Sequence, residues 1–340
     1  MSRPGSPLLA VFVLGTLGLP ACSDDRPGSY DFGPYQIAAN DEIESECVQI
    51  SLHNTEPIYV NAVELTTGPG FHHSNWTYVP EHVFAGPDGK FDCYERGYSE
   101  AISAVFGGVL FAQSTQTPHE VQAFPPGTAV KLPPKTKLIA QVHLLNPTDT
   151  ALQLRPNITL TTIPEAEVTK MLAGISFQDQ ALALPPTRQS RFTVECDLAE
   201  RHRELLGSDP NFHIYYGLAH YHTLGTGLLL EAVRPDGTAT PIYNTRTLVG
   251  DTLGGPIDPP FDMTGYTRLR FSCDFYNPRA DVVKWGVGDQ EMCVFLAFSD
   301  SPYAWGGGMN EQIDPSNETP VGNALYYSSP CEVFATDARR

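Results

Sequence analysis

Positive charge is scarce in this sequence. Lysine and arginine total 21 residues against 39 aspartates and glutamates, which gives a formal net charge of −18 at pH 7. Nucleic-acid binding depends on cationic contacts to phosphates, and an acidic chain repels them. We therefore exclude a nucleic-acid partner.

The sequence also lacks a hydrophobic run of the roughly 20 residues needed to cross a bilayer. The longest run, residues 8–19, has the length of a signal-peptide core. It leads into Leu19-Pro20-Ala21-Cys22 and Ser23, which resemble a bacterial lipobox apart from the unusual Pro20. We predict a signal peptide at 1–21, lipidation of Cys22 and a mobile tether at 22–42. The alternative is an ordinary secretory signal with a chance cysteine.

This resemblance predicts an exported lipoprotein that meets the membrane through its lipid anchor only. It would face the periplasm or the cell surface, and Ser23 after the lipidated cysteine resembles sorting to the outer membrane.

No two cysteines have the Cys-x-x-Cys spacing typical of zinc sites. Without Cys22 an even number remains, which suits disulfides in an oxidising compartment. Sequence alone allows fifteen pairings of six cysteines, and some of them could be buried free thiols. The six are Cys47, Cys93, Cys196, Cys273, Cys293 and Cys331.

Stretches that favour long helices are few. The 30 prolines and 29 glycines are scattered and punctuate short segments, which is typical of strands joined by turns. We predict an all-β chain with two domains, 43–164 and 165–336, one or two helical turns at 166–173, and a loop over 300–330. Strand-like runs occur at 47–52, 137–142, 214–218, 228–233 and 294–298.

Histidines carry the clearest chemical pattern. His220 and His222 are two apart, so on a strand both imidazoles project to one face. Adjacent His72 and His73 would point to opposite faces unless the chain bends, and the preceding Gly68-Pro69-Gly70 can supply a bend. Each feature alone is more often a surface pair or loop polarity.

His143 and Met292 complete a possible ligand set. A lone methionine is usually core filler. However, a thioether favours Cu(I) and imidazole suits both oxidation states of copper. Two histidines with a methionine, beside three histidines, make a sensible pair of redox copper sites.

The local sequences around these residues resemble the copper type II, ascorbate-dependent monooxygenases, the family of peptidylglycine α-hydroxylating monooxygenase and dopamine β-hydroxylase. The resemblance spans roughly residues 47–331, with the ligands in the family's order. The matching segments are Gly70-Phe71-His72-His73, Leu138-Ile139-Ala140-Gln141-Val142-His143, Ala219-His220-Tyr221-His222-Thr223-Leu224-Gly225 and Gly288-Asp289-Gln290-Glu291-Met292-Cys293.

This resemblance implies two copper ions per chain. His72, His73 and His143 would hold an electron-transfer copper, and His220, His222 and Met292 would hold the catalytic copper that activates O2. The implied fold is two antiparallel, jelly-roll-like β-sandwich domains with a cleft between the coppers. The implied disulfides are Cys47–Cys93, Cys196–Cys331 and Cys273–Cys293.

The resemblance also implies hydroxylation of a C–H bond in a small-molecule substrate, with O2 and a reductant such as ascorbate. Peptidylglycine enzymes bind a substrate carboxylate with polar residues at positions that here are Leu218, Val294 and Leu296. We therefore expect a neutral, largely apolar substrate. Gln141 is a candidate to support His143, and an exported copper-binding protein without turnover is the alternative function.

Overall fold

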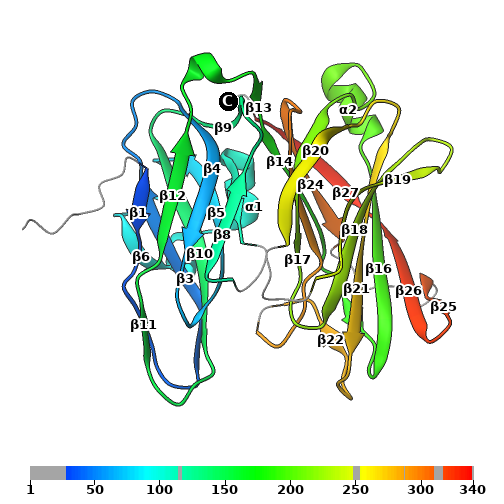
Figure 1. Cartoon of the computed structure of the whole chain (residues 1–340), viewed down its shortest axis with the longest axis horizontal. Helices are drawn as coiled ribbons and strands as arrows, with labels where there is room; N and C mark the ends of the chain where they lie inside the picture. Colours follow the sequence, from blue (N-terminus) through cyan, green and yellow to red (C-terminus); the bar gives the residue numbers. More distant parts are fainter. Residues whose placement is uncertain (1–27, 114–116, 248–252, 287, 310–316, 339–340) are drawn as a thin grey trace, which may run out of the picture.

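The computed structural model describes residues 28–113, 117–247, 253–286, 288–309 and 317–338. Two β-sandwiches lie side by side and are joined near residue 172 (Figure 1). The all-β prediction is confirmed, since strands dominate and the helices of the described residues are short.

The first sandwich pairs a five-stranded sheet with a six-stranded one. The five-stranded sheet has the order β6-β3-β10-β5-β7, with β6 (Gly89–Asp92), β3 (Asp41–Ser51), β10 (Thr136–Asn146), β5 (Phe71–Pro80) and β7 (Gly108–Ala112). The six-stranded sheet has the order β1-β12-β4-β9-β13, with β8 also on β4. Its members are β1 (Ser29–Asp31), β12 (Asn157–Thr162), β4 (Ile58–Thr66), β9 (Thr128–Leu132), β13 (Lys170–Met171) and β8 (His119–Ala123).

Short elements complete this half of the chain. They are the pair β2 (Tyr35–Ile37) and β11 (Leu152–Leu154), the helix α1 (Glu100–Phe106), and the 3-10 turns η1 (Tyr94–Arg96) and η2 (Glu165–Glu167).

The second sandwich pairs two six-stranded sheets. The inner sheet, which faces the first sandwich, has the order β20-β17-β23-β14-β24-β27, with β20 (Gly254–Asp262), β17 (His213–His220), β23 (Val294–Ser299), β14 (Ala173–Asp179), β24 (Tyr303–Met309) and β27 (Glu332–Asp337). The outer sheet has the order β19-β18-β21-β16-β26-β25, with β19 (Ala239–Thr245), β18 (Gly225–Val233), β21 (Arg268–Asn277), β16 (Arg188–Asp197), β26 (Ala324–Pro330) and β25 (Thr319–Val321). The pair β15 (Ala183–Leu184) and β22 (Val283–Lys284) and the helix α2 (Ala199–Leu206) complete it.

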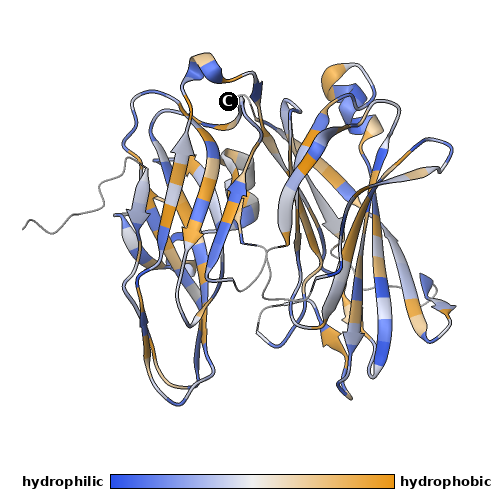
Figure 2. Cartoon of the chain, viewed as in Figure 1, coloured by the Kyte–Doolittle hydropathy of each residue, from blue (hydrophilic) through white to orange (hydrophobic). Residues whose placement is uncertain are grey.

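The sheets are not purely antiparallel. Parallel pairs join β13 to β9, β14 to β24 and β16 to β26. Hydrophobic residues alternate along the strands of both sandwiches (Figure 2), and each sandwich buries its own apolar cluster. Tyr216, Leu218 and Phe298 of the inner sheet belong to the first sandwich's cluster, so the two halves share a packed interface.

The predicted domain boundaries need correction. The tether prediction is wrong from Ser29 onwards, because β1 and β2 fall in this stretch and Phe32, Tyr35 and Ile37 are buried in the first sandwich. The predicted helical turns at 166–173 reduce to η2, and β13 then joins the first sandwich's sheet. The proposed signal peptide and Cys22 lie outside the described residues.

The three disulfides implied by the resemblance are confirmed: Cys47–Cys93, Cys196–Cys331 and Cys273–Cys293. The first closes part of the first sandwich, and the other two lie within the second. In the part of the chain that the structure describes, no helix is long and apolar enough to span a membrane.

Candidate metal centre

His72 and His73 open β5, and a β-bulge brings them to the same side. His143 on β10 pairs with His73, whereas the next residue, Leu144, pairs with Phe71, so His72 is an extra residue in the ladder. A bulge turns a side chain that regular alternation would send to the other face. Gly70 precedes it with φ +90°, a conformation that favours glycine. The bend that joint ligation requires is therefore present.

His143 lies on the neighbouring strand β10 and is held by a carboxylate. Its Nε2–H donates to Oε1 of Glu42, on β3, at 2.8 Å. This bond fixes the tautomer and leaves Nδ1 as the acceptor nitrogen, and Nδ1 is buried without a hydrogen-bond partner. A histidine that donates one ring N–H to a carboxylate has the arrangement usual for a metal ligand.

His220 ends β17 and His222 lies in the turn that follows. The Nδ1–H of His222 donates to the carbonyl of Gln290 at 2.8 Å, and its Nε2 is buried without a hydrogen-bond partner. The buried Glu291 carboxylate accepts the backbone N–H groups of His222 at 2.9 Å and Leu224 at 2.7 Å. Glu291 thereby fixes the turn that presents His222.

Met292 lies half-buried two residues before the start of β23, next to Glu291 in the chain. Its backbone N–H donates to the same Glu291 carboxylate at 3.3 Å. Val294, two residues further on, is the register partner of His220. One carboxylate therefore ties the backbone of the methionine segment to the backbone of the histidine turn.

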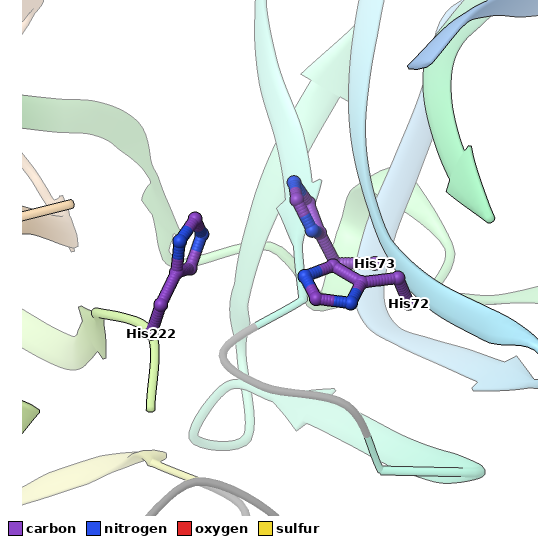
Figure 3. Close-up of side chains that lie close together, drawn as sticks. All are labelled: His72, His73 and His222. Carbon is purple, nitrogen blue, oxygen red and sulfur yellow. The ribbon is translucent and has the colours of Figure 1, made fainter. Parts of the chain in front are cut away.

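The two predicted ligand sets meet in one cluster. His72 and His73 approach from β5, and His222 approaches from the second sandwich (Figure 3). Ring centroids lie 5.8 Å apart for His72 and His222 and 5.1 Å apart for His73 and His220. All five imidazoles are between 3% and 8% exposed. The prediction of two sites separated by a cleft therefore needs correction for this structure: the sandwiches pack together where the cleft was expected.

Burial favours the neutral form of His72, His73 and His222. Desolvation, and then the neighbouring rings of His143, His222 and His220, lowers the pKa of His72 to about 3. Burial also lowers the pKa of His73 well below its ordinary value. The pKa of His222 falls for the same reason, although the hydrogen bond to Gln290 opposes it. Neutral imidazole is the form that binds a metal ion.

The residues fit a metal ion of the copper or zinc class. One nitrogen from each of His72, His73 and His222 lies within 4.8 Å of the other two. The Nδ1 atoms of His73 and His143 and the Nε2 atom of His222 are buried without hydrogen-bond partners, which is costly unless something binds them. An ion that prefers imidazole nitrogen would satisfy these atoms.

No protein-family model matches this chain. No curated protein matches it either.

Similar solved structures include a protein from Parabacteroides distasonis described as secreted, with 10% identity over 80% of this chain and 88% of that chain and a TM-score of 0.22. They also include the PBSX exported protein XepA, with 6% identity over 79% and 86% of the two chains and a TM-score of 0.22. PNGF-II has 8% identity over 79% and 65% and a TM-score of 0.31. Such TM-scores assign neither family nor activity, so the resemblance to copper monooxygenases stays a prediction.

Sequence reasoning missed two carboxylates at this centre. Glu291 precedes Met292 in the matched segment, so the sequence could have identified it as a residue near the candidate metal centre. Glu42 lies far from His143 in the chain, and only the pairing of β3 with β10 brings the two together. Gln141, the predicted support for His143, instead donates to the backbone carbonyl of Glu44 at 3.1 Å.

Proposed function

We propose that this chain is a copper-dependent monooxygenase that hydroxylates a C–H bond of a small, neutral or apolar substrate with O2 and an external reductant such as ascorbate. The observation that carries the proposal is the cluster of five buried imidazoles, with the backbone of Met292 tied through Glu291 to the turn that holds His222. Two of its histidines, His143 and His222, are oriented by polar partners that leave their other ring nitrogen buried without a hydrogen-bond partner.

Copper bound by these residues would supply one-electron redox chemistry and O2 activation. In the overall reaction, a C–H bond, O2, two electrons and two protons give a C–OH group and water. The chain's own part is to hold and orient the ligands. Glu42 and the Gln290 carbonyl select the tautomers of His143 and His222, and Glu291 fixes the backbone around His222 and Met292.

The face of the inner sheet beside His220 supports an apolar substrate. Phe295 and Ala297 of β23 belong to the second sandwich's core, so Val294 and Leu296 face the other way, towards the first sandwich. Phe298, on that same face, contacts Phe124 of the first sandwich, with ring centroids 4.8 Å apart. Leu218 pairs with Leu296 beside it. A charged group would lose its hydration on this surface without gaining a partner.

Metal analysis of Met292→Ile tests the assignment. Reconstitution of the parent should give two copper ions per chain. The variant should retain the three-histidine copper, because only the thioether ligand is lost, and should lose oxygen chemistry. Loss of both coppers, or full activity in the variant, would show that the ligand assignment is wrong.

Oxygen uptake separates the enzyme from its alternative, an exported protein that stores or delivers copper. A monooxygenase consumes O2 with a reductant and substrate, whereas a storage protein binds copper without steady uptake. The buried, closely packed imidazoles of this structure are the observation that favours the alternative.

We also propose that the chain is exported and anchored by a lipid on Cys22. The three disulfides suit an oxidising compartment. Mass spectrometry of the mature N-terminus should find an acylated Cys22. An N-terminus at another residue without acyl groups would rule out the lipid anchor.

A further inference from the structure

One group of possible metal ligands crosses the boundary between the sandwiches. His72 and His73 come from β5 of the first sandwich, and His222 comes from the turn after β17 of the second (Figure 3). Within the described residues, this is the group in which three imidazole nitrogens lie within 4.8 Å of one another. It draws on both of the ligand sets that the sequence predicts.

The geometry is close to that of a bound ion. Bonds of 2.0–2.1 Å in a tetrahedral site place the ligand nitrogens about 3.4 Å apart. Small rotations of the three rings would therefore close the group around one ion. Nδ1 of His73 and Nε2 of His222 are already buried without hydrogen-bond partners. The bond from His222 to the Gln290 carbonyl keeps its other nitrogen protonated, so Nε2 is the atom that can bind.

We propose that His72, His73 and His222 form a shared site that binds the first metal ion and joins the two sandwiches. The chemical class is a transition-metal ion that prefers imidazole, namely copper or zinc. This site does not depend on whether the protein turns over a substrate.

The shared site and the two separate copper sites exclude each other, because both arrangements use His222. Binding of a second ion, with one ion in each predicted set, requires His222 to leave His72 and His73. Loading should therefore occur in two steps, with the second equivalent bound more weakly than the first.

Titration of the metal-free full chain with Cu²⁺ against a competing chelator tests the proposal. His222→Ala should weaken binding of the first equivalent by at least about tenfold, since loss of even a supporting contact costs that much. His119→Ala is the matched control: this exposed histidine pairs with Glu64 outside the cluster, and the variant should bind the first equivalent like the parent. His222→Asn, whose side-chain amide can still donate to Gln290, repeats the test if the alanine variant does not fold.

The comparison with His143→Ala decides between the two arrangements. First-equivalent binding that is unchanged in His222→Ala and weakened in His143→Ala would place the ion in the first sandwich alone and overturn the proposal. Absence of substrate turnover would contradict the proposed enzyme activity and leave this binding result unaffected.

Discussion

At the scale of single residues, Glu42 orients a buried ligand candidate, because its carboxylate accepts the Nε2–H of His143. The Glu42→Gln variant keeps the shape but removes the charge that strengthens this bond. Copper affinity of the three-histidine set should fall by about 10–100-fold, the usual cost of losing such a partner. Competitive chelator titration measures the change.

Glu64→Gln serves as the control for that variant. Glu64 accepts a hydrogen bond from His119 at 2.9 Å, and both side chains are exposed, so the substitution changes a similar pair away from the cluster. Equal copper affinities in the parent and Glu42→Gln would show that Glu42 does not orient His143.

Asp179 predicts a pH dependence of stability. Burial raises the pKa of its carboxyl to about 6, and the Ala181 N–H that it accepts opposes this only in part. A raised folded-state pKa stabilises the protein below the ordinary value of 3.8, and this stabilisation is lost as the pH rises through about 6. The loss should approach about 3 kcal/mol at about 1.4 kcal/mol per pH unit. Asp179→Asn keeps the acceptor oxygen but cannot ionise, so the variant should lack this pH-dependent loss of stability.

Urea unfolding of parent and variant between pH 4 and pH 8 measures this effect, with the disulfides intact. The difference in the free energy of unfolding between Asp179→Asn and the parent should grow as the pH rises. A difference that is constant with pH would show that Asp179 titrates as it does in the unfolded chain.

The sequence allowed the ligand residues to be proposed because local chemistry and spacing carry that information. Strand alternation predicted one face for His220 and His222; the structure instead puts His222 in the turn after β17, where Glu291 fixes its backbone. Met292 is recognisable by its neighbours. Glu42 could not be found in this way, since its contact depends on the register of β3 against β10. Contacts of high sequence separation leave no local pattern.

At the scale of elements, the Cys273–Cys293 disulfide connects the outer sheet to the segment that carries Met292. It closes a loop with a sequence separation of 20 residues. Replacing both cysteines by alanine should lower the free energy of unfolding by about 3 kcal/mol. It should also weaken copper binding at the methionine site, because Met292 adjoins Cys293. Thermal unfolding and copper titration measure the two effects.

Replacement of Cys47 and Cys93 provides the matched comparison. That disulfide lies in the first sandwich, so its loss should destabilise the chain without a selective effect on the methionine site. Equal losses of copper from that site in both double variants would contradict the role given to Cys273–Cys293.

Elements with weak local patterns were predicted least well. The stretch over 300–330 was expected to be a loop, yet β24, β25 and β26 fall within it. Packing explains Gly306 in this stretch, because a Cβ there would lie 2.2 Å from the Phe334 ring. Phe32 and Tyr35 lie in the stretch that was predicted to be a tether. Their burial depends on packing against distant residues of the first sandwich, which the local sequence does not indicate.

At the scale of the whole molecule, the apolar face beside His220 predicts substrate selectivity. We expect no processing of peptides that end in glycine, because Leu218, Val294 and Leu296 offer no partner for a carboxylate. Incubation of the copper-loaded, ascorbate-reduced protein with a glycine-extended peptide should give no α-hydroxyglycine. Efficient turnover of that peptide would contradict the prediction.

The contact between the sandwiches could not be predicted from the sequence. Strand periodicity identifies which face of a strand is buried, but not against which sheet it packs. Tyr216 and Phe298 lie in strand-like runs of the second half, yet both pack against Phe124 of the first. The meeting of the five imidazoles follows from this packing.

The connection between the sandwiches determines how the histidines of the first sandwich could separate from those of the second. Only Leu172 separates β13, which is hydrogen-bonded into the first sandwich, from β14 of the second, and Leu172 is itself buried (Figure 1). Ala173 pairs with Ser299 at this end of the inner sheet, whereas Gln178 pairs with Val294, the partner of His220, about 17 Å away. Because a single buried residue connects the two sheets, the two sandwiches cannot move apart at this end. A rotation of one sandwich relative to the other about residue 172 would displace His220 and His222 more than it displaces the residues near the junction.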